Sequence, residues 1–473
     1  MNQKQHIPLN CKVGLFFLML ISAFKTVAQI PQLYDADYLP QSLMLNPGNE
    51  VDFDKHLGIP LLSGIGVGVG LRNVSVYDIF QVNENTEINA RIRAKADQLT
   101  NKDYGVLHQN LEILSAGFRN KKGNYISFGW YEALDAVAYF PKDIATLAYE
   151  GNQQNLGYSF KASDIKARAE MVSVFHIGMN KKINERLTLG GRFKIYSGMF
   201  SAESTTNTGT FTTYLTPDGN NFYEHRLANI DGGLKIAGTG SFEEFSQSQI
   251  LQNSVFSGNY GAGIDLGFSY KLNERWVVSG SLLDLGFIHY SSNTYEYYGE
   301  GDFTFDGIEF IFPSVVDNNM AIRPYWTDLE DEFRENMTFD EREDIQYTVL
   351  RPVTLLGGLS YAFGERLDCN CLDPEEDRFR FKTGLQAMAI KRPRGVQAGL
   401  TAFLDAPLTS FLNTKLTYGI DAFTYTNVGF LISAKIRSFN VYLAADNLLS
   451  YSNIADSNTA SFQIGFQLIS NKN

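Results

Sequence analysis

The chain has 473 residues and a formal net charge of −12, so it offers no basic surface to neutralise phosphates, and we exclude nucleic acid as a partner. After residue 28 no run approaches about 18 consecutive apolar residues, which excludes a membrane-spanning helix. The composition is rich in Phe, Tyr and Gly, with 35, 25 and 41 copies, and the remaining way to pair every backbone polar group inside a bilayer is a closed β-barrel.

The first 28 residues are typical of an export signal. Two lysines precede an apolar run at residues 13–24, and the small residue Ala28 ends the segment. The apolar run is about half of the roughly 20 residues that a membrane-spanning helix needs. We therefore predict a signal peptide over residues 1–28. Cys11 precedes the apolar run, so we do not expect it to carry a lipid anchor.

Residues 29–55 follow the signal and do not alternate as a strand does. The segment contains Pro31, Pro40 and Pro47 among large apolar side chains. Those side chains have to be buried, and the nearest enclosed place is the lumen of the barrel whose first strand follows. We therefore predict that residues 29–55 form a plug-like segment in the lumen and that the barrel occupies residues 56–473.

The first predicted strand, residues 57–72, alternates glycine with aliphatic residues from Gly64 to Gly70. Alternate glycines also occur in nucleotide-binding loops, but no Gly-Lys-Ser/Thr motif and no helix-opening third glycine follow here. Small residues on the luminal face of a strand explain the pattern better. The next segment, residues 77–100, has apolar residues near a 3.6-residue period, which predicts a short helix in the first long excursion.

Short polar turns separate most of the later strands. Residues 182–186 and 271–275 each read Lys-x-Asn-Glu-Arg between alternating runs, which is typical of a β-hairpin, and similar turns lie at 120–123, 363–366 and Ser438. The predicted strands after the first are 107–119, 125–140, 171–182, 187–200, 258–272, 276–290, 347–363, 379–390, 396–404, 415–425, 428–437, 439–446 and 460–468.

Short turns alternate with long inserts along the chain. In single-chain barrels the short turns face the periplasm and the long loops face the exterior. We therefore expect residues 203–256 and 293–345 outside the cell, with Asn184 and Asn273 at the periplasmic rim. A secreted β-sandwich or propeller would also alternate, but it does not need this asymmetry.

The predicted fold class is therefore all-β, a transmembrane antiparallel up-and-down β-barrel of about fourteen strands. It has a short N-terminal plug-like segment and long extracellular loops. Fourteen strands satisfy the alternation of turns, and one wrongly assigned strand would give twelve or sixteen instead.

Two local features are open to more than one chemical interpretation. Cys369 and Cys371 are separated by one residue near a short turn. Three interpretations are open: a small disulfide, two free thiols, or part of a soft-metal site. We favour the disulfide. The acidic stretch at residues 328–344 is explained by a solvated surface. Calcium binding is its alternative, although the ordered spacing of a calcium loop is missing.

No catalytic motif is present in the sequence. The histidines of the mature chain are scattered without the spacing of a zinc site, and no Gly-x-Ser-x-Gly motif marks a hydrolase nucleophile. They are His56, His108, His176, His225 and His289. We therefore predict that the protein is not an enzyme, has no catalytic, metal-binding or cofactor-binding residue, and uses no cofactor.

Three segments carry a resemblance to known proteins. Residues 38–48 (Tyr-Leu-Pro-Gln-Ser-Leu-Met-Leu-Asn-Pro-Gly), 57–61 and 281–288 resemble an uncharacterised family of Bacteroidetes outer-membrane barrels. This family lies near the PorP/SprF-like proteins of type IX secretion and gliding, and more distantly it is similar to the long-chain fatty-acid transporter barrels of about fourteen strands. The resemblance covers essentially the whole mature chain, and its motifs are structural.

The resemblance implies a protein of the cell outer membrane that contacts outer-membrane lipid and is inserted by the barrel-assembly machinery. Our first hypothesis is a non-enzymatic barrel that acts as a structural or partner-binding component of cell-surface or secretion machinery, with secretion or gliding proteins as partners. The alternative is a plugged barrel for passive or gated transport of a hydrophobic or small solute. The apolar segment 29–55 and the glycine-rich first strand favour that alternative.

Overall fold

The structure is a computed structural model that describes residues 31–81, 87–216, 223–238, 253–305, 332–366 and 379–470. The predicted signal peptide, residues 1–28, lies outside the described residues, and so do Cys369 and Cys371. Among the helices of these ranges, none is long and apolar enough to cross a bilayer.

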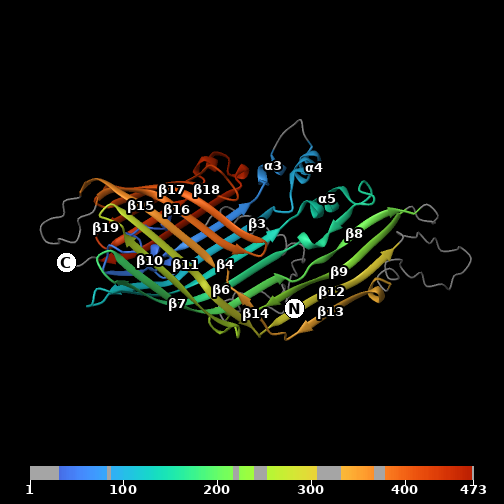
Figure 1. Ribbon diagram of the computed structural model, residues 1–473, viewed down its shortest axis with the longest axis horizontal. Coiled ribbons are helices and arrows are strands. Elements are labelled where there is room, and N and C mark those ends of the chain that lie inside the picture. The colour runs from blue at the N-terminus through green and yellow to red at the C-terminus, as the bar shows by residue number, and fades with distance from the viewer. Residues whose placement is uncertain are drawn as a thin grey trace, which may run out of the picture.

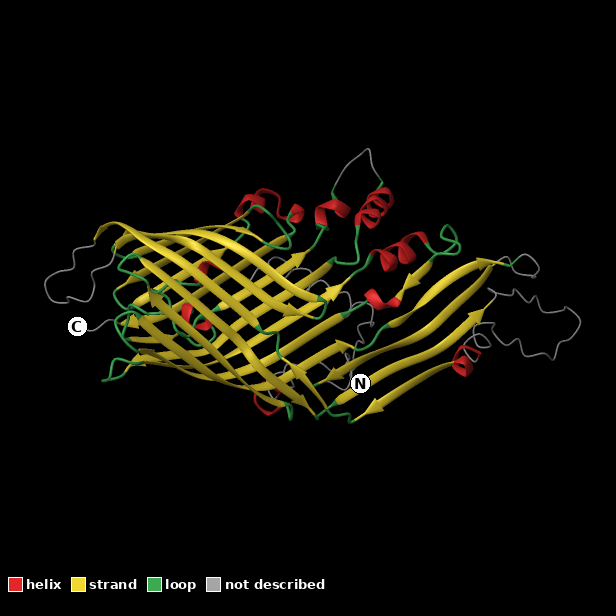
Figure 2. Cartoon of the chain, in the orientation of Figure 1, coloured by secondary structure: helices red, strands yellow, loops and turns green. Residues whose placement is uncertain are grey.

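A closed antiparallel barrel dominates the molecule, and within the described residues fourteen strands build its wall (Figures 1 and 2). In order around the barrel they are β1 (Lys55–Gly58) continued by β2 (Ile65–Leu71), β3 (Tyr104–Arg119), β4 (Tyr125–Tyr139), β6 (Ala167–Lys182), β7 (Leu187–Ser204), β10 (Tyr260–Lys271), β11 (Trp276–Tyr290), β15 (Thr354–Arg366) preceded by β14 (Tyr347–Leu350), β16 (Phe379–Arg392), β17 (Gly395–Thr409), β18 (Leu412–Ile420), β19 (Asn427–Ile436), β20 (Phe439–Ala445) and β21 (Thr459–Ser470). Pairing of β2 with β21, as at Val67 and Phe462, closes the ring. The predicted fold class and strand number are confirmed.

The two faces of the wall differ in chemistry because side chains alternate along each strand. On β7, Phe193 and Ile195 are 47% and 49% exposed on the outer face, whereas Arg192 and Lys194 are 4% and 1% exposed on the inner face. The other strands follow the same pattern of apolar residues outside and polar residues inside. This pattern is typical of a barrel that lies in lipid.

The Asn-Glu-Arg segments form tight turns at one end of the barrel. The Asn184 side chain accepts hydrogen bonds from the backbone N–H groups of Arg186 and Leu187, at 2.9 and 2.8 Å. Asn273 closes the turn between β10 and β11 in the same way, with Arg275 and Trp276 as donors. We call this end the short-turn end. The side of the membrane that it faces stays a prediction.

Several strands differ from their predicted ranges: β17 runs to Thr409 rather than 404, and the predicted strand 347–363 is divided into β14 and β15. In two strands the difference has a local cause. The first is interrupted between β1 and β2, because Pro60 has no N–H to donate and Leu61 adopts a left-handed φ of 64°. β18 ends at Ile420 rather than 425, because the Asp421 carboxylate accepts the backbone N–H groups of Phe423 and Thr424 and folds the chain into a turn.

The opposite end of the barrel carries the long inserts. The predicted helix at 77–100 is present as two pieces, α3 (Val76–Phe80) and α4 (Ile88–Gln98). Other helical pieces of this end include α5 (Lys142–Glu150), η2 (Ala162–Asp164) and η3 (Leu448–Asp456). Figure 2 shows these helices grouped along one side of this end.

The two longest inserts are not simple loops. They contain β8 (Thr208–Leu215), β9 (Tyr223–Ala237), β12 (Thr294–Phe305) and β13 (Met337–Glu343), which with β5 (Ser159–Lys161) form an antiparallel sheet. β9 pairs with the end of β7, so this extension sheet continues the barrel wall beyond its rim (Figure 1). The alternating Tyr, Phe and Leu residues of these strands explain why the inserts pair instead of remaining loops.

Candidate functional site

Residues 31–54 lie inside the barrel, and we call them the luminal segment. They include η1 (Pro31–Leu33) and α2 (Ser42–Leu45). Leu33, Ala36 and Leu39 are buried against Leu431 of β19 and Tyr442 of β20. Farther along, the segment packs Leu43, Val51 and Phe53 against Tyr125 and Ile469. Together these contacts bury the apolar residues that the sequence left without a strand.

The luminal segment is acidic, and the wall around it is basic. Residues 31–54 contain five carboxylates and no Lys or Arg. The Lys382 ammonium donates to the Asp35 carbonyl at 2.6 Å and contacts the Asp37 carboxylate at 3.2 Å. At the short-turn end, Arg119 donates to Asp54 at 2.9 Å and to the carbonyl of Val51 at 2.9 Å. The charges of segment and wall are therefore complementary.

Two glycines of the wall form the closest seat of the luminal segment. Gly190 and Gly267 are directly paired across β7 and β10. A Cβ atom at Gly190 would overlap the Pro47 carbonyl, and one at Gly267 would overlap the Asn46 side chain. The Asn46-Pro47-Gly48 turn therefore rests on backbone alone, which only glycine permits. We call the Gly190–Gly267 pair the glycine platform.

Asparagine side chains fix this turn on the glycine platform. Asn46 donates to the Phe268 carbonyl at 3.2 Å, and its own oxygen accepts the Gly48 N–H at 2.9 Å. From β6, Asn180 donates to the carbonyls of Pro47 and Asn49 at 3.1 and 2.6 Å. The turn is thus held by directed hydrogen bonds on both sides of the glycines.

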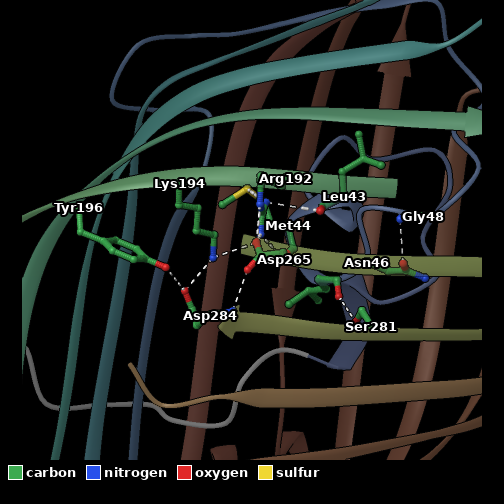
Figure 3. Close-up of polar contacts among 11 residues, drawn as sticks. Leu43, Met44, Asn46, Gly48, Arg192, Lys194, Tyr196, Asp265, Ser281 and Asp284 are labelled. Carbon is green, nitrogen blue, oxygen red and sulfur yellow. Dashed lines mark hydrogen bonds and ion pairs between the residues drawn. The ribbon is translucent and has the colours of Figure 1, made fainter. Parts of the chain in front are cut away.

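Arg192 joins the luminal segment to a buried charge network in the wall. Its guanidinium donates to the Met44 carbonyl at 2.8 Å and, through Nε, to the Asp265 carboxylate at 2.6 Å. Lys194 lies 2.9 Å from the same carboxylate and 2.7 Å from that of Asp284. Figure 3 shows Arg192 and Lys194 projecting from β7 toward these two aspartates. The network needs all of its members, because an unpaired buried charge is costly.

A second buried cluster lies nearer the long-insert end. Arg351, in the short link between β14 and β15, forms an ion pair with Glu170 of β6. Tyr290 of β11 donates to the other oxygen of Glu170 at 3.0 Å. Arg351 also stacks 5.4 Å from the ring centre of Tyr196, whose hydroxyl donates to Asp284. The two clusters therefore form one continuous polar network along the inner wall.

Ion pairs also cross the lumen. Asp135 of β4 accepts a hydrogen bond from Arg392 of β16 at 2.5 Å and contacts His108 of β3 at 2.6 Å. Beside them, Arg394 donates to Asp164 at 2.7 Å and stacks on Tyr139. We call these contacts the cross-lumen bridge.

The position of the bridge follows from the strand order. β4 and β16 are six strands apart in one direction around the barrel and eight in the other. The bridge therefore joins opposite walls and draws the turn between β16 and β17 across the mouth. A ring contact between Tyr104 and Phe423, with centres 5.5 Å apart, supports it on the same side.

A large apolar furrow lies on the outer face of the wall. Its volume is about 1610 Å³, and it follows two neighbouring rows of outward register partners from β7 to β18. Small outward residues, among them Gly280, Gly357 and Ala389, form its floor, and larger ones such as Leu266 and Leu355 form its sides. At the mouth the furrow reaches the residues of the cross-lumen bridge.

The histidines singled out in the sequence do not meet. His56 contacts Tyr125 at the short-turn end, His108 belongs to the bridge, and His225 lies in the extension sheet. Within the described ranges no group of His, Cys, Asp and Glu is arranged to hold a metal ion. The acidic stretch 328–344 is described from residue 332 on, and the carboxylates of β13 (Met337–Glu343) are exposed.

The luminal charges were not recognised in the sequence. The signal that marks them is the alternation of inward and outward positions along a strand, which we call parity. Arg192 and Lys194 alternate with Phe193 and Ile195, and Asp265 lies between two apolar residues. A charge at an inward position of a strand needs a partner inside the barrel. Parity does not reveal which partner is reached.

Comparisons with known proteins place the chain in a family. The chain belongs to the family of unknown function DUF5723, which matches residues 47–446. No curated protein matches its sequence.

Among solved structures, the P. putida toluene transporter TodX is 9% identical, with a TM-score of 0.39 over 94% of this chain and 97% of that one. A Pseudomonas aeruginosa FadL homologue is 8% identical, with a TM-score of 0.39 over the same shares of the two chains. The toluene transporter TbuX of Ralstonia pickettii is 9% identical, with a TM-score of 0.39 over 92% of this chain and 94% of that one.

Proposed function

We propose that the protein is a gated transport barrel of the outer membrane, in which residues 31–54 are the movable plug. The observation that carries this proposal is how the luminal segment is held. Its contacts are noncovalent, and many of them are hydrogen bonds from wall side chains to its carbonyl groups. Such bonds exchange with water at a small net cost, so the segment can leave its seat while the strands stay paired to one another.

The residues of the wall behind the segment favour a hydrophobic or small solute as the transported molecule. Leu283 and Leu356 pack against Tyr34, and Leu431 packs against Leu33, all from inward positions of the strands. A purely aqueous channel would carry polar residues at these places. When the plug moves, these apolar patches become available to a solute of matching chemistry.

Displacing the plug tests this function. Gly190→Val places a side chain where the Pro47 carbonyl rests, while Gly191→Val adds the same side chain to the outer face, where a Cβ meets only ordinary contacts. In planar bilayers we expect Gly190→Val to show an ionic current well above that of the wild type, because the seat is lost. Gly191→Val should match the wild type. Equal currents in the two variants would contradict the proposal.

A second function is favoured by the extension sheet. Its strand β13 pairs with β12 and with no other strand among the described residues, and Phe339 and Tyr297 are 52% and 41% exposed on the sheet. Exposed aromatic residues beside a strand with no second strand partner in the described part of the chain suit the binding of a partner protein. Affinity purification in mild detergent tests it, since Phe339→Ser should then lose partners that the wild type retains in stoichiometric amounts.

A further inference from the structure

We propose that the furrow on the outer wall binds one anionic phospholipid, with an acyl chain along its floor and the phosphate at its mouth. This site lies on the outer face of the wall, meets the lumen only at the mouth, and does not depend on plug movement. The furrow lies on the face that contacts lipid, so a membrane lipid is the occupant available to it along its whole length.

The shape of the furrow follows from the register of the wall. Gly280 is paired with Gly357, and Ala389 is paired with Leu355 and with Ala398. Each small residue faces outward, because its neighbours in sequence face the luminal segment, as Ser279 and Ser281 do on either side of Gly280. Small residues interspersed with leucines in these two rows give a depression that an acyl chain fills.

The outer wall of a barrel is ordinarily convex, so a depression of about 1610 Å³ calls for a cause. The cross-lumen bridge supplies one. Arg392 and Arg394 hold the β16–β17 turn against β4 and η2, and we infer that this pull inclines the adjoining wall toward the lumen. The outer face beneath the turn is then hollowed, and the hollow ends at the mouth.

Charge at the mouth selects the headgroup. Four cations line this end of the furrow, Arg72, Lys102, Arg392 and Arg394, against one carboxylate, Asp421, among its described lining residues. Three of the cations already have acidic partners, namely Asp103, Asp135 and Asp164. Lys102 is exposed and makes no ion pair within the described part of the chain. An ammonium at the open end of an apolar furrow fits a phosphate.

Native mass spectrometry of the purified barrel tests the site with two lipids of identical chains, phosphatidylglycerol and phosphatidylcholine. We expect one phosphatidylglycerol per chain, bound about tenfold more tightly than phosphatidylcholine, the ratio that one partly desolvated charge contact supplies. Lys102→Gln should bring phosphatidylglycerol down to the level of phosphatidylcholine. Equal binding of both lipids by the wild type would overturn the proposal.

A furrow-filling variant separates this site from the general lipid surface. Ala389→Phe should weaken both lipids, and Gly357→Leu, a second filling variant, covers the case in which Ala389→Phe does not fold. The control is Ala434→Phe, an outward alanine of β19 that does not line the furrow. If the filling variants bind lipid as Ala434→Phe does, the furrow is not the site. The ionic current of the filling variants should equal that of the wild type, which keeps this test independent of transport.

Discussion

The luminal segment and the cross-lumen bridge both occupy the passage through the barrel, but they are built differently. The segment is held by apolar packing, by the glycine platform and by hydrogen bonds to several strands. The bridge depends on two carboxylates, Asp135 and Asp164. Loss of one contact leaves the segment seated by the others, even where it costs stability, whereas loss of either carboxylate opens the bridge. We therefore expect the segment to control passage and the bridge to control the shape of the mouth.

Arg192→Met should have the largest effect on stability. It removes the donor to the Met44 carbonyl and leaves Asp265 with Lys194 as its main partner. Breaking a buried charge network in this way costs about 3–5 kcal/mol of unfolding free energy. Denaturant unfolding in detergent measures it, with Arg186→Met in the exposed turn as the control, expected to stay within about 0.5 kcal/mol of the wild type. Equal losses in both variants would show that the network does not hold the segment.

Asp135→Asn breaks the bridge and should have the second-largest effect on stability. It removes the charge from the pairs with Arg392 and His108, so we expect a loss of about 2 kcal/mol. The ionic current should stay near the wild-type value, because the luminal segment keeps its seat. A current as large as that of Gly190→Val would reverse the roles assigned to the two regions.

The sequence predicts the strands and the luminal segment, but it does not predict the charged pairs on which these two variants act. Fourteen strands, their short turns and the luminal position expected for residues 29–55 all follow from local patterns of alternation and proline. The partners of the luminal charges do not, because Arg192 meets Asp265 across 73 residues and Arg392 meets Asp135 across 257. Such pairs depend on strand order and barrel closure, which no local pattern records.

The inserts show the same limit. The sequence predicts an external loop over 203–256, yet β8 and β9 lie within it and pair with a register shift that alternation alone does not reveal. The relation to secretion and gliding proteins and the outer-membrane location stay predictions.

Gln41→Ala should have a smaller effect than either charged variant. The Gln41 amide donates to the Ser63 carbonyl at 3.0 Å and to Glu112 at 3.1 Å, which anchors the segment to β3 by neutral donors. The loss should be about 1 kcal/mol. Limited proteolysis of the segment measures the change in its mobility. Cleavage as fast as in Arg192→Met would mean that anchors of different strength contribute equally.

The smallest effect is expected at α3, which touches neither the segment nor the bridge. Partial burial raises the pKa of Asp78, but hydrogen bonds from Lys95 and Ser75 outweigh it and lower that pKa below its ordinary value. A lowered pKa stabilises the fold above the unfolded-state pKa, and this contribution is lost as the pH falls through the folded-state pKa. The protection factors of the α3 amides against hydrogen exchange should therefore fall only in acid. Asp78→Asn should remove that pH dependence, and a dependence that survives would rule out Asp78 as its source.

The central claim, that passage requires movement of the luminal segment, is tested most directly by tethering it. Ser279 of β11 lies 3.1 Å from Asp35 of the segment, measured between side-chain oxygens, and both side chains are short, so Asp35→Cys with Ser279→Cys brings two thiols within reach of a disulfide. The background carries Cys369→Ser and Cys371→Ser, and the single-cysteine variants are controls. In vesicles, uptake of the hydrophobic dye N-phenylnaphthylamine should stop on oxidation and return with reductant. Uptake that is the same in the oxidised and reduced states would contradict the account.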